Sequence, residues 1–341
     1  MVHAFCVGSR PEFRYDTSFI SGDVPHSMTD KIYLDEAIRD LHTVLDMVRW
    51  TVSRFNYAQL YYGHGTDNSW DEAVCLVMHA LHLPQDITAR TGDGLFSARL
   101  TQSEKEKITD LVLKRVQTRM PLPYITHEAW FCDMPFYVDE RVLIPRSPFA
   151  ELIKTRFAPY LEETVEPTSI LDMCTGGGCI AIALAHTFPL AQVDAVDISF
   201  DALEVADFNI QEHNLGDRVF PIHSDLFTSL EGQQYDLIVS NPPYVDEEDM
   251  NDLPDEYQHE PELALAAGED GLDLVEQMLK HAPHYLKDSG WMLVEVGNSE
   301  VHMATRFPGL HVDWVELQQG GHGIFAVSKS SLVTYLNGKE N

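Results

Sequence analysis

A glycine turn between two regular elements is the feature of this sequence that most constrains its fold. Residues 170–181 read Ile-Leu-Asp-Met-Cys-Thr-Gly-Gly-Gly-Cys-Ile-Ala, which predicts a buried strand, a tight turn and the start of a helix. Gly176, Gly178 and Ala181 fit the spacing G-x-G-x-x-A. Asp197 ends the next predicted strand, where a carboxylate can accept hydrogen bonds from both hydroxyls of a ribose. A tight packing turn would explain the glycines alone, but the turn and Asp197 together favour a nucleoside-cofactor site.

Strands and helices alternate through the second half of the chain. Apolar runs predict strands at residues 169–173, 192–196, 219–223, 236–240 and 291–296, and helical patterns fall at 179–186, 201–213 and 273–285. Residues 312–317 and 322–328, around Gln319-Gly320-Gly321, predict an antiparallel C-terminal hairpin. This alternation is typical of an α/β, Rossmann-like domain, in which helices cover both faces of a mainly parallel sheet.

The glycine turn does not identify the cofactor, because NAD and S-adenosylmethionine both place a ribose near such an acid. Asp172 precedes the glycines, where a methionine ammonium group needs an anion and a pyrophosphate does not. After the third strand, Asp225 is a candidate acceptor for an adenine amine, with Leu226 or Phe227 against the ring. The alternative is structural: Asp172 caps the turn and Asp225 is an ordinary loop residue. We favour the functional interpretation and S-adenosylmethionine.

The segment Asn241-Pro242-Pro243-Tyr244 follows the fourth predicted strand, at the sheet edge where ligands bind in parallel sheets. An amine on an sp² carbon is a poor nucleophile because its lone pair is delocalised. The Asn241 side-chain carbonyl and the Pro242 backbone carbonyl can accept both N–H bonds and direct the lone pair toward an electrophile. Tyr244 can stack on a flat amide or base. An ordinary turn is the alternative, but this position favours transfer to a planar nitrogen.

The net charge of the chain limits the class of macromolecule that we expect it to bind. Lys and Arg number 23 against 54 Asp and Glu, so the formal net charge is −31, which disfavours binding to nucleic acid and suits a basic protein partner. The 17 residues from Asp246 to Glu262 hold nine acids and no Lys or Arg, which predicts either a rim that attracts a basic protein or a solvated loop. Five cysteines without a C-x-x-C pair and the absence of a signal or membrane segment lead us to expect a cytoplasmic protein without a metal site.

Sequence patterns in the first third of the chain predict helices. Residues 1–27 are expected to be a poorly ordered extension, and Met28 is an alternative start. Apolar residues recur at helical spacing over 30–50, and further helices are expected at 71–82, after a cap at Asn68 or Ser69, and at 104–119, after a capping box that begins at Thr101. We expect a helical domain over 28–120, a β-hairpin linker over 121–147 with strands at 130–131 and 136–138, and an α/β domain over 148–335 that opens with a helix at 149–157.

These segments resemble the class I S-adenosylmethionine-dependent methyltransferases and, among them, the protein-(glutamine-N5) methyltransferases, over most of the chain. Residues 121–126 (PLPYIT), 142–146 (VLIPR) and 260–265 (EPELAL) are similar to family segments on either side of the catalytic loop. One branch methylates the Gly-Gly-Gln glutamine of peptide-chain release factors, and the other a glutamine of large-subunit ribosomal protein three. Residues 62–68 (YGHGTDN), 70–73 (WDEA) and 172–176 (DMCTG) are similar to the ribosomal-protein branch, whereas the release-factor branch usually has Pro where Ser147 follows Arg146.

The resemblance implies a seven-stranded sheet, an N-terminal substrate-recognition domain, S-adenosylmethionine as cofactor and a basic ribosomal protein as substrate. Together with the residue chemistry it predicts a site in three parts. The residues expected to hold the cofactor are Asp172, Thr175, Gly176, Gly178, Asp197, Ile198, Asp225, Leu226 and Asn241. Those expected to hold the substrate are Arg146, Asn241, Pro242, Pro243 and Tyr244, of which Asn241, Pro242 and Tyr244 are the catalytic candidates.

Three alternatives remain open from the sequence. The first is methylation of release factors at the Gly-Gly-Gln motif. The second is methylation of adenine in DNA or RNA, since a base amine suits the same loop, although the net charge disfavours it. The third is a ribosome-assembly factor that binds a partner without transferring a methyl group, which the intact Asn-Pro-Pro-Tyr segment disfavours.

Overall fold

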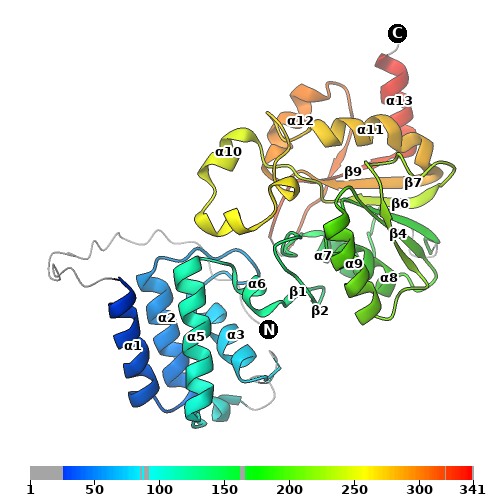
Figure 1. Cartoon of the computed structure of the whole chain (residues 1–341). Helices are drawn as coiled ribbons and strands as arrows, with labels where there is room; N and C mark the ends of the chain where they lie inside the picture. Colours follow the sequence, from blue (N-terminus) through cyan, green and yellow to red (C-terminus); the bar gives the residue numbers. More distant parts are fainter. Residues whose placement is uncertain (1–25, 85–86, 88–91, 162–165, 319, 340–341) are drawn as a thin grey trace.

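The computed structural model describes residues 26–84, 87, 92–161, 166–318 and 320–339 (Figure 1). Most of the predicted N-terminal extension therefore lies outside the described residues, and His26 and Ser27 begin the first helix. None of the helices in this described part of the chain combines the length and apolarity that crossing a membrane requires.

The N-terminal helices pack around a core of their own, drawn from buried side chains of α2, α3, α5 and α6. Their bounds are α1 His26–Asp40, α2 Val44–Tyr57, α3 Ser69–Ala80, α5 Gln102–Thr118 and α6 Leu122–Thr126. The helical pattern over 30–50 is divided between α1 and α2, because Thr43 forms a capping box with Asp46 and starts a new helix. The predicted cap at Asn68 and the capping box of Thr101 and Glu104 are confirmed.

The linker contains one element that the sequence analysis missed. Helix α6 begins between Pro121 and Pro123, because proline lacks only an N–H that the first helical turn leaves unpaired. A hairpin is present, with β1 Ala129–Phe131, β2 Met134–Phe136, and Cys132 and Asp133 at positive φ in the turn. The second strand differs from the one predicted over 136–138: it ends at Phe136, because the two-residue turn already pairs Met134 with Phe131. The helix expected over 149–157 is shorter, α7 Phe149–Lys154.

A seven-stranded sheet forms the centre of the second half of the chain, with the order β5-β4-β3-β6-β7-β9-β8. Its strands are β3 Ser169–Met173, β4 Gln192–Asp197, β5 Val219–His223, β6 Tyr235–Ser240, β7 Leu286–Glu295, β8 Asp313–Trp314 and β9 Ile324–Ser328. The first five in this order are parallel, and β9 runs antiparallel to both neighbours, which confirms the predicted C-terminal hairpin. The chain leaves β3 first toward β4 and later returns to β6, so the carboxyl ends of these strands form the switch point where ligands bind.

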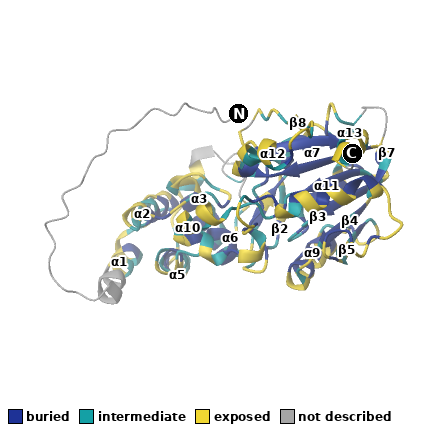
Figure 2. Ribbon diagram, turned by 90° about the horizontal axis from the view of Figure 1, so that it is seen from above, coloured by how far each residue is buried: buried dark blue, intermediate teal, exposed yellow. Residues whose placement is uncertain are grey.

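Helices cover both faces of the sheet, as predicted for this fold class. On one face lie α7, α8 Cys179–Thr187 and α9 Phe200–Glu212; on the other lie α11 Asp273–Tyr285, α12 Glu300–Arg306 and α13 Lys329–Lys339. Figure 2 shows the central strands as mainly buried and the outer sides of these helices as exposed. The sequence analysis did not anticipate α12, α13 or the short helix α10 Glu247–Asp252, which lies between the helical region and the sheet (Figure 1).

Candidate active site

Two cavities meet at the carboxyl edge of the sheet. The first cavity is lined by the glycine turn, by residues that follow β4, β5 and β6, and by the segments 141–147 and 261–264, which cover it. The second cavity is lined by the loop after β6 together with residues of α10 and the segment that follows it. Four residues line both cavities: Leu143, Arg146, Asn241 and Ala264. The two cavities are therefore neighbours that share one wall.

Glycines in the turn after β3 serve two purposes. Gly176 and Gly178 have φ angles of +54° and +82°, which L-residues with side chains rarely adopt. A Cβ on Gly178 would lie 3.2 Å from Cβ of Ala206, so this glycine lets α9 pack against the turn. A Cβ on Gly176 would meet nothing within 4 Å, so the backbone here is open to the first cavity, which Gly176 lines.

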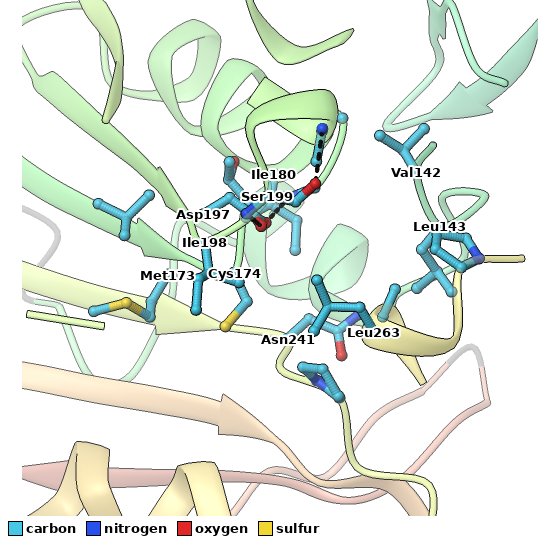
Figure 3. Close-up of a pocket in the computed structure, with 18 of the residues that line it drawn as sticks. Val142, Leu143, Met173, Cys174, Ile180, Asp197, Ile198, Ser199, Asn241 and Leu263 are labelled. Carbon is cyan, nitrogen blue, oxygen red and sulfur yellow. Dashed lines mark hydrogen bonds between the residues drawn. The ribbon is translucent and has the colours of Figure 1, made fainter. Parts of the chain in front are cut away.

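Asp197 ends β4 and fastens the glycine turn to it. Its Oδ2 accepts a hydrogen bond from the Gly176 amide at 2.8 Å, and its Oδ1 accepts one from the Ser199 amide at 2.9 Å. Burial raises the pKa of this carboxyl above its usual range. Because each carboxylate oxygen can accept two hydrogen bonds, Asp197 keeps acceptor capacity for a ligand in the first cavity, which it lines (Figure 3).

Asp172 lies behind the turn, and it is not part of the lining of the first cavity, whereas Thr175 is. Its Oδ2 accepts hydrogen bonds from the Thr175 hydroxyl at 2.6 Å and the Ala181 amide at 3.0 Å, which is the turn-capping role considered as the structural alternative. Its Oδ1 is buried and has no hydrogen-bond partner among the described residues. Burial raises the pKa of Asp172 to about 7, despite the two hydrogen bonds. A positive charge nearby would stabilise its ionised form.

The loops after β4 and β5 supply the far wall of the first cavity. Ile198, Asp225 and Leu226 all line it, and the Asp225 side chain is exposed. Phe227 was the other candidate to pack against an adenine ring. It is buried instead and stacks on Tyr285, with ring centroids 4.6 Å apart, so Leu226 is the one of the pair that faces the cavity.

Asn241 is the first residue after β6 and lines both cavities. Figure 3 shows its side chain among the residues that line the first. Its side-chain Oδ1 is buried and has no hydrogen-bond partner among the described residues. Pro243 lines the first cavity, and Pro242 and Tyr244 line the second. A buried carbonyl oxygen without a donor is rare in folded proteins, so this atom is poised to accept a hydrogen bond from a ligand.

A hydrogen-bond network holds Tyr244 in place. Its hydroxyl donates to Oε1 of Glu295 at 3.1 Å, and Ser147 donates to Oε2 of the same carboxylate at 2.6 Å. A Cβ on Gly297 would lie 2.5 Å from the Tyr244 ring, so only glycine allows the ring to pack there. Burial raises the pKa of both Glu295 and Tyr244. Glu295 lies near the end of the strand predicted over 291–296, and no motif in the sequence marks its role.

Arg146 was predicted to bind substrate, and the structure gives its guanidinium a partner within the chain. Its two terminal nitrogens donate to the two carboxylate oxygens of Glu260, at 2.6 and 2.7 Å. Glu260 also accepts from the Ile144 amide at 3.0 Å, and Nε2 of His64 lies 3.5 Å from it. Burial acts to raise the pKa of Glu260, but the contacts with His64 and Arg146 outweigh it and lower this pKa to about 2.

A second buried acid joins the same segment to the N-terminal helices. Glu256 accepts a hydrogen bond from the Tyr61 amide at 2.9 Å and pairs with Arg119 at 2.9 Å and Arg115 at 3.6 Å. Two of the nine acids in the segment, Glu256 and Glu260, are therefore neither an exposed rim nor a solvated loop. The sequence analysis missed both, since only their buried cationic partners distinguish them from the exposed acids around them.

The donor and acceptor set of the first cavity fits S-adenosylmethionine. Asp197 and Asp225 offer acceptors, Leu226 and Ile198 offer apolar surface, and Gly176 leaves the backbone open. The unpartnered Oδ1 of Asp172 lies behind the turn, where the ammonium of a methionine group would offset its burial. Within the described residues, no group of three or more His, Cys, Asp or Glu side chains is placed to hold a metal ion.

The sheet order and this site define a class I S-adenosylmethionine-dependent methyltransferase. Residues 156–256 match the family model of the methyltransferase small domain. The ribosomal protein uL3 glutamine methyltransferase of Francisella tularensis is 46% identical over 88% of this chain and 94% of its own length, and that of Neisseria gonorrhoeae is 46% identical over 88% and 98%. The chain belongs to the family of ribosomal protein uL3 glutamine methyltransferases. Among solved structures, the hMettl16 catalytic domain matches 65% of this chain and 80% of its own, at 16% identity and a TM-score of 0.43.

Proposed function

We propose that this enzyme transfers a methyl group from S-adenosylmethionine to the side-chain amide nitrogen of a glutamine in ribosomal protein uL3. One observation carries the proposal: the buried Oδ1 of Asn241 has no hydrogen-bond partner among the described residues, and it belongs to the wall between the two cavities. An electrophile in the first cavity and a carboxamide in the second would meet at this atom. The names of the two relatives support the choice of uL3 as substrate.

Asn241 and Pro242 perform the central task, which is to make a carboxamide nitrogen reactive. The Asn241 Oδ1 and the Pro242 carbonyl oxygen accept the two N–H bonds, so the nitrogen lone pair is directed toward the first cavity. Pro242 and Pro243 keep this loop rigid, because their φ angles are locked. The acceptors are in place before reaction and need no reorganisation, which is where most of the rate enhancement arises. When bound, S-adenosylmethionine supplies the electrophilic methyl group.

The remaining predicted residues have supporting roles in this proposal. Asp197 accepts hydrogen bonds from the ribose, Asp225 accepts one from the adenine amine, and Ile198 and Leu226 pack against the base. Thr175 and Gly178 shape the glycine turn, and Asp172 stabilises positive charge beside it. Tyr244, held by Glu295, forms a fixed wall for the amide plane. Arg146 acts through its ion pair with Glu260, which fixes the wall that the two cavities share.

We further propose how the parts of the chain divide the work. Residues 28–120 serve as the substrate-recognition domain, 121–147 as the linker, and 148–335 as the methyltransferase domain, in a cytoplasmic protein. The contacts of Glu256 and Glu260 with the helical region support this division, because they connect a recognition surface to the wall of the second cavity. The net charge of −31 supports a basic protein substrate.

A methyl-transfer assay tests the proposed function. Purified enzyme with labelled S-adenosylmethionine is offered purified uL3, a release factor or duplex DNA, and the products are analysed by mass spectrometry. We expect one methyl group on a glutamine side chain of uL3 and none on DNA. Transfer to the Gly-Gly-Gln glutamine of the release factor, or to adenine, contradicts the choice of substrate. Binding of uL3 without transfer contradicts the enzymatic mechanism.

A further inference from the structure

The second cavity has a charge that the methyl-transfer chemistry does not require. Besides the catalytic loop, its lining includes two carboxylates, Asp249 and Asp252, and the amide of Asn298. The one cationic residue of this lining, Arg146, is paired through both terminal nitrogens with Glu260 and so adds no net positive charge. The cavity that would receive the glutamine is therefore acidic.

The acids of residues 246–262 differ in whether they have a cationic partner. Those that face the helical region have cationic partners: Glu260 with Arg146, Glu256 with Arg119, and Asp255 with Arg119 at 3.4 Å. Asp249 and Asp252 make no ion pair among the described residues; Asp249 has only the Asn298 amide, whose Nδ2 lies 3.4 Å from its Oδ2. Asp249 and Asp252 are therefore the acids of this segment that line the second cavity without a cationic partner among the described residues.

We propose that Asp249 and Asp252 determine substrate specificity by binding a Lys or Arg side chain that lies within a few residues of the target glutamine. The inference rests on the proposed function, since the glutamine carboxamide must reach Asn241, which lines the same cavity. The buried, unpartnered Oδ1 of Asn241 points to a ligand there independently of the acids. A single peptide segment then places its glutamine against Asn241 and its basic side chain against α10.

The comparison that tests this inference uses two double variants of α10 with the same net charge. Asp249→Asn with Asp252→Asn removes the carboxylates that line the second cavity. Glu247→Gln with Glu248→Gln removes two exposed carboxylates of the same helix that do not line it. Cofactor affinity and thermal unfolding check that both proteins fold. Methylation of full-length uL3 is measured with each, at low and at high salt.

We expect the first double variant to raise KM for uL3 about tenfold at low salt, because two ion pairs made by exposed carboxylates are lost, while kcat changes less than about twofold. High salt should reduce this difference, since it screens the wild-type pairs. The Glu247/Glu248 control should change KM less than about twofold. Changing the basic residues near the methylated glutamine to Gln should weaken wild-type activity about as much, and should not weaken the Asp249/Asp252 variant further.

Equal effects of the two double variants on KM would overturn the inference, as would wild-type activity that ignores the basic residues of the substrate. The proposed function is judged separately, by whether the wild-type enzyme methylates uL3 at all. Should a release factor be the protein methylated, the same pair of variants measured with that protein still decides whether Asp249 and Asp252 bind a basic neighbour of the glutamine.

Discussion

Two buried carboxylates, one behind each cavity, show how differently the two sides of the site are built. Asp172 is buried with hydroxyl and amide donors but no cation, and its pKa rises to about 7. Glu260 is equally buried but contacts Arg146 and His64, and its pKa falls to about 2. The first cavity is backed by an acid that a positively charged ligand would ionise. On the side of the second cavity, the chain itself supplies the cationic partners of the buried acid.

The two sides also differ in how far apart in the sequence their interacting residues lie. Asp172, Thr175 and Ala181 all belong to one short strand–turn–helix segment, and Asp197 ends the next strand. The partners of Glu260 come from two distant parts of the chain, around residues 64 and 144–146. Four experiments test whether the two sides differ in this way.

The largest effect is expected at Asn241, which lines both cavities. Asn241→Ala removes one of the two acceptors that direct the lone pair, and we expect kcat to fall about 1,000-fold, as for loss of a preorganised polar group. Cofactor affinity should change less than about threefold, because Asp197 and the glycine turn are untouched. Calorimetry with S-adenosylhomocysteine and single-turnover methylation of uL3 measure the two quantities. A variant with wild-type turnover would refute the role of Asn241.

Loss of the buried charge on the substrate side should mainly affect stability. Glu260→Gln leaves Arg146 partly buried without its counter-ion, and we expect the free energy of unfolding at pH 7 to fall by about 3 kcal/mol. Glu262→Gln, an exposed acid in the same segment, is the matched control and should cost less than about 0.5 kcal/mol. The contribution of Glu260 is present above its unfolded pKa, near 4, and is lost as the pH falls toward 2. Urea unfolding of both variants at pH 7 measures the difference, and equal losses would show that the ion pair adds no stability.

The same contrast explains what could be predicted from the sequence. The sheet, its C-terminal hairpin and the proposed cofactor residues follow from patterns inside short segments, and the strands at 169–173 and 219–223 are confirmed residue for residue. Glu260, Glu256 and Glu295 could not be predicted, because an acid that will be buried against an arginine looks the same in sequence as one exposed to water. The break between α1 and α2 was missed because the apolar pattern continues across the capping box of Thr43.

Replacing Asp197, the acid proposed to bind the ribose, should weaken cofactor binding without unfolding the protein. Asp197→Asn keeps one acceptor and the shape of the side chain, but it removes the charge that strengthens two hydrogen bonds to a ribose. We expect the Kd for S-adenosylhomocysteine to rise about 30-fold, or about 2 kcal/mol. Asp201→Asn, an exposed acid in the first turn of α9, is the matched control. Equal affinity in the two variants would remove Asp197 from the binding site.

The smallest expected effect is a pH dependence of ligand affinity that arises from Asp172. It tests the contrast between the two sides most directly. With a pKa of about 7, the folded chain without ligand holds a proton on Asp172 at pH 6 and on half of the molecules at pH 7. An ammonium bound nearby favours the ionised form, so binding should release this proton, and affinity should rise about fivefold from pH 6 to pH 7. The amine of the ligand stays charged over this range, because α-amino groups titrate near 7.7–8.0.

Two controls separate Asp172 from the rest of the site. Methylthioadenosine has the same nucleoside but no ammonium, so its affinity should follow only the titration of Asp197, whose pKa burial also raises. Asp172→Asn cannot ionise, so it should abolish the additional pH dependence seen with S-adenosylhomocysteine. A rise of equal size for both ligands would mean that ligand charge does not change the ionisation of Asp172. The two sides of the site would then differ only in how far along the chain their interacting residues lie.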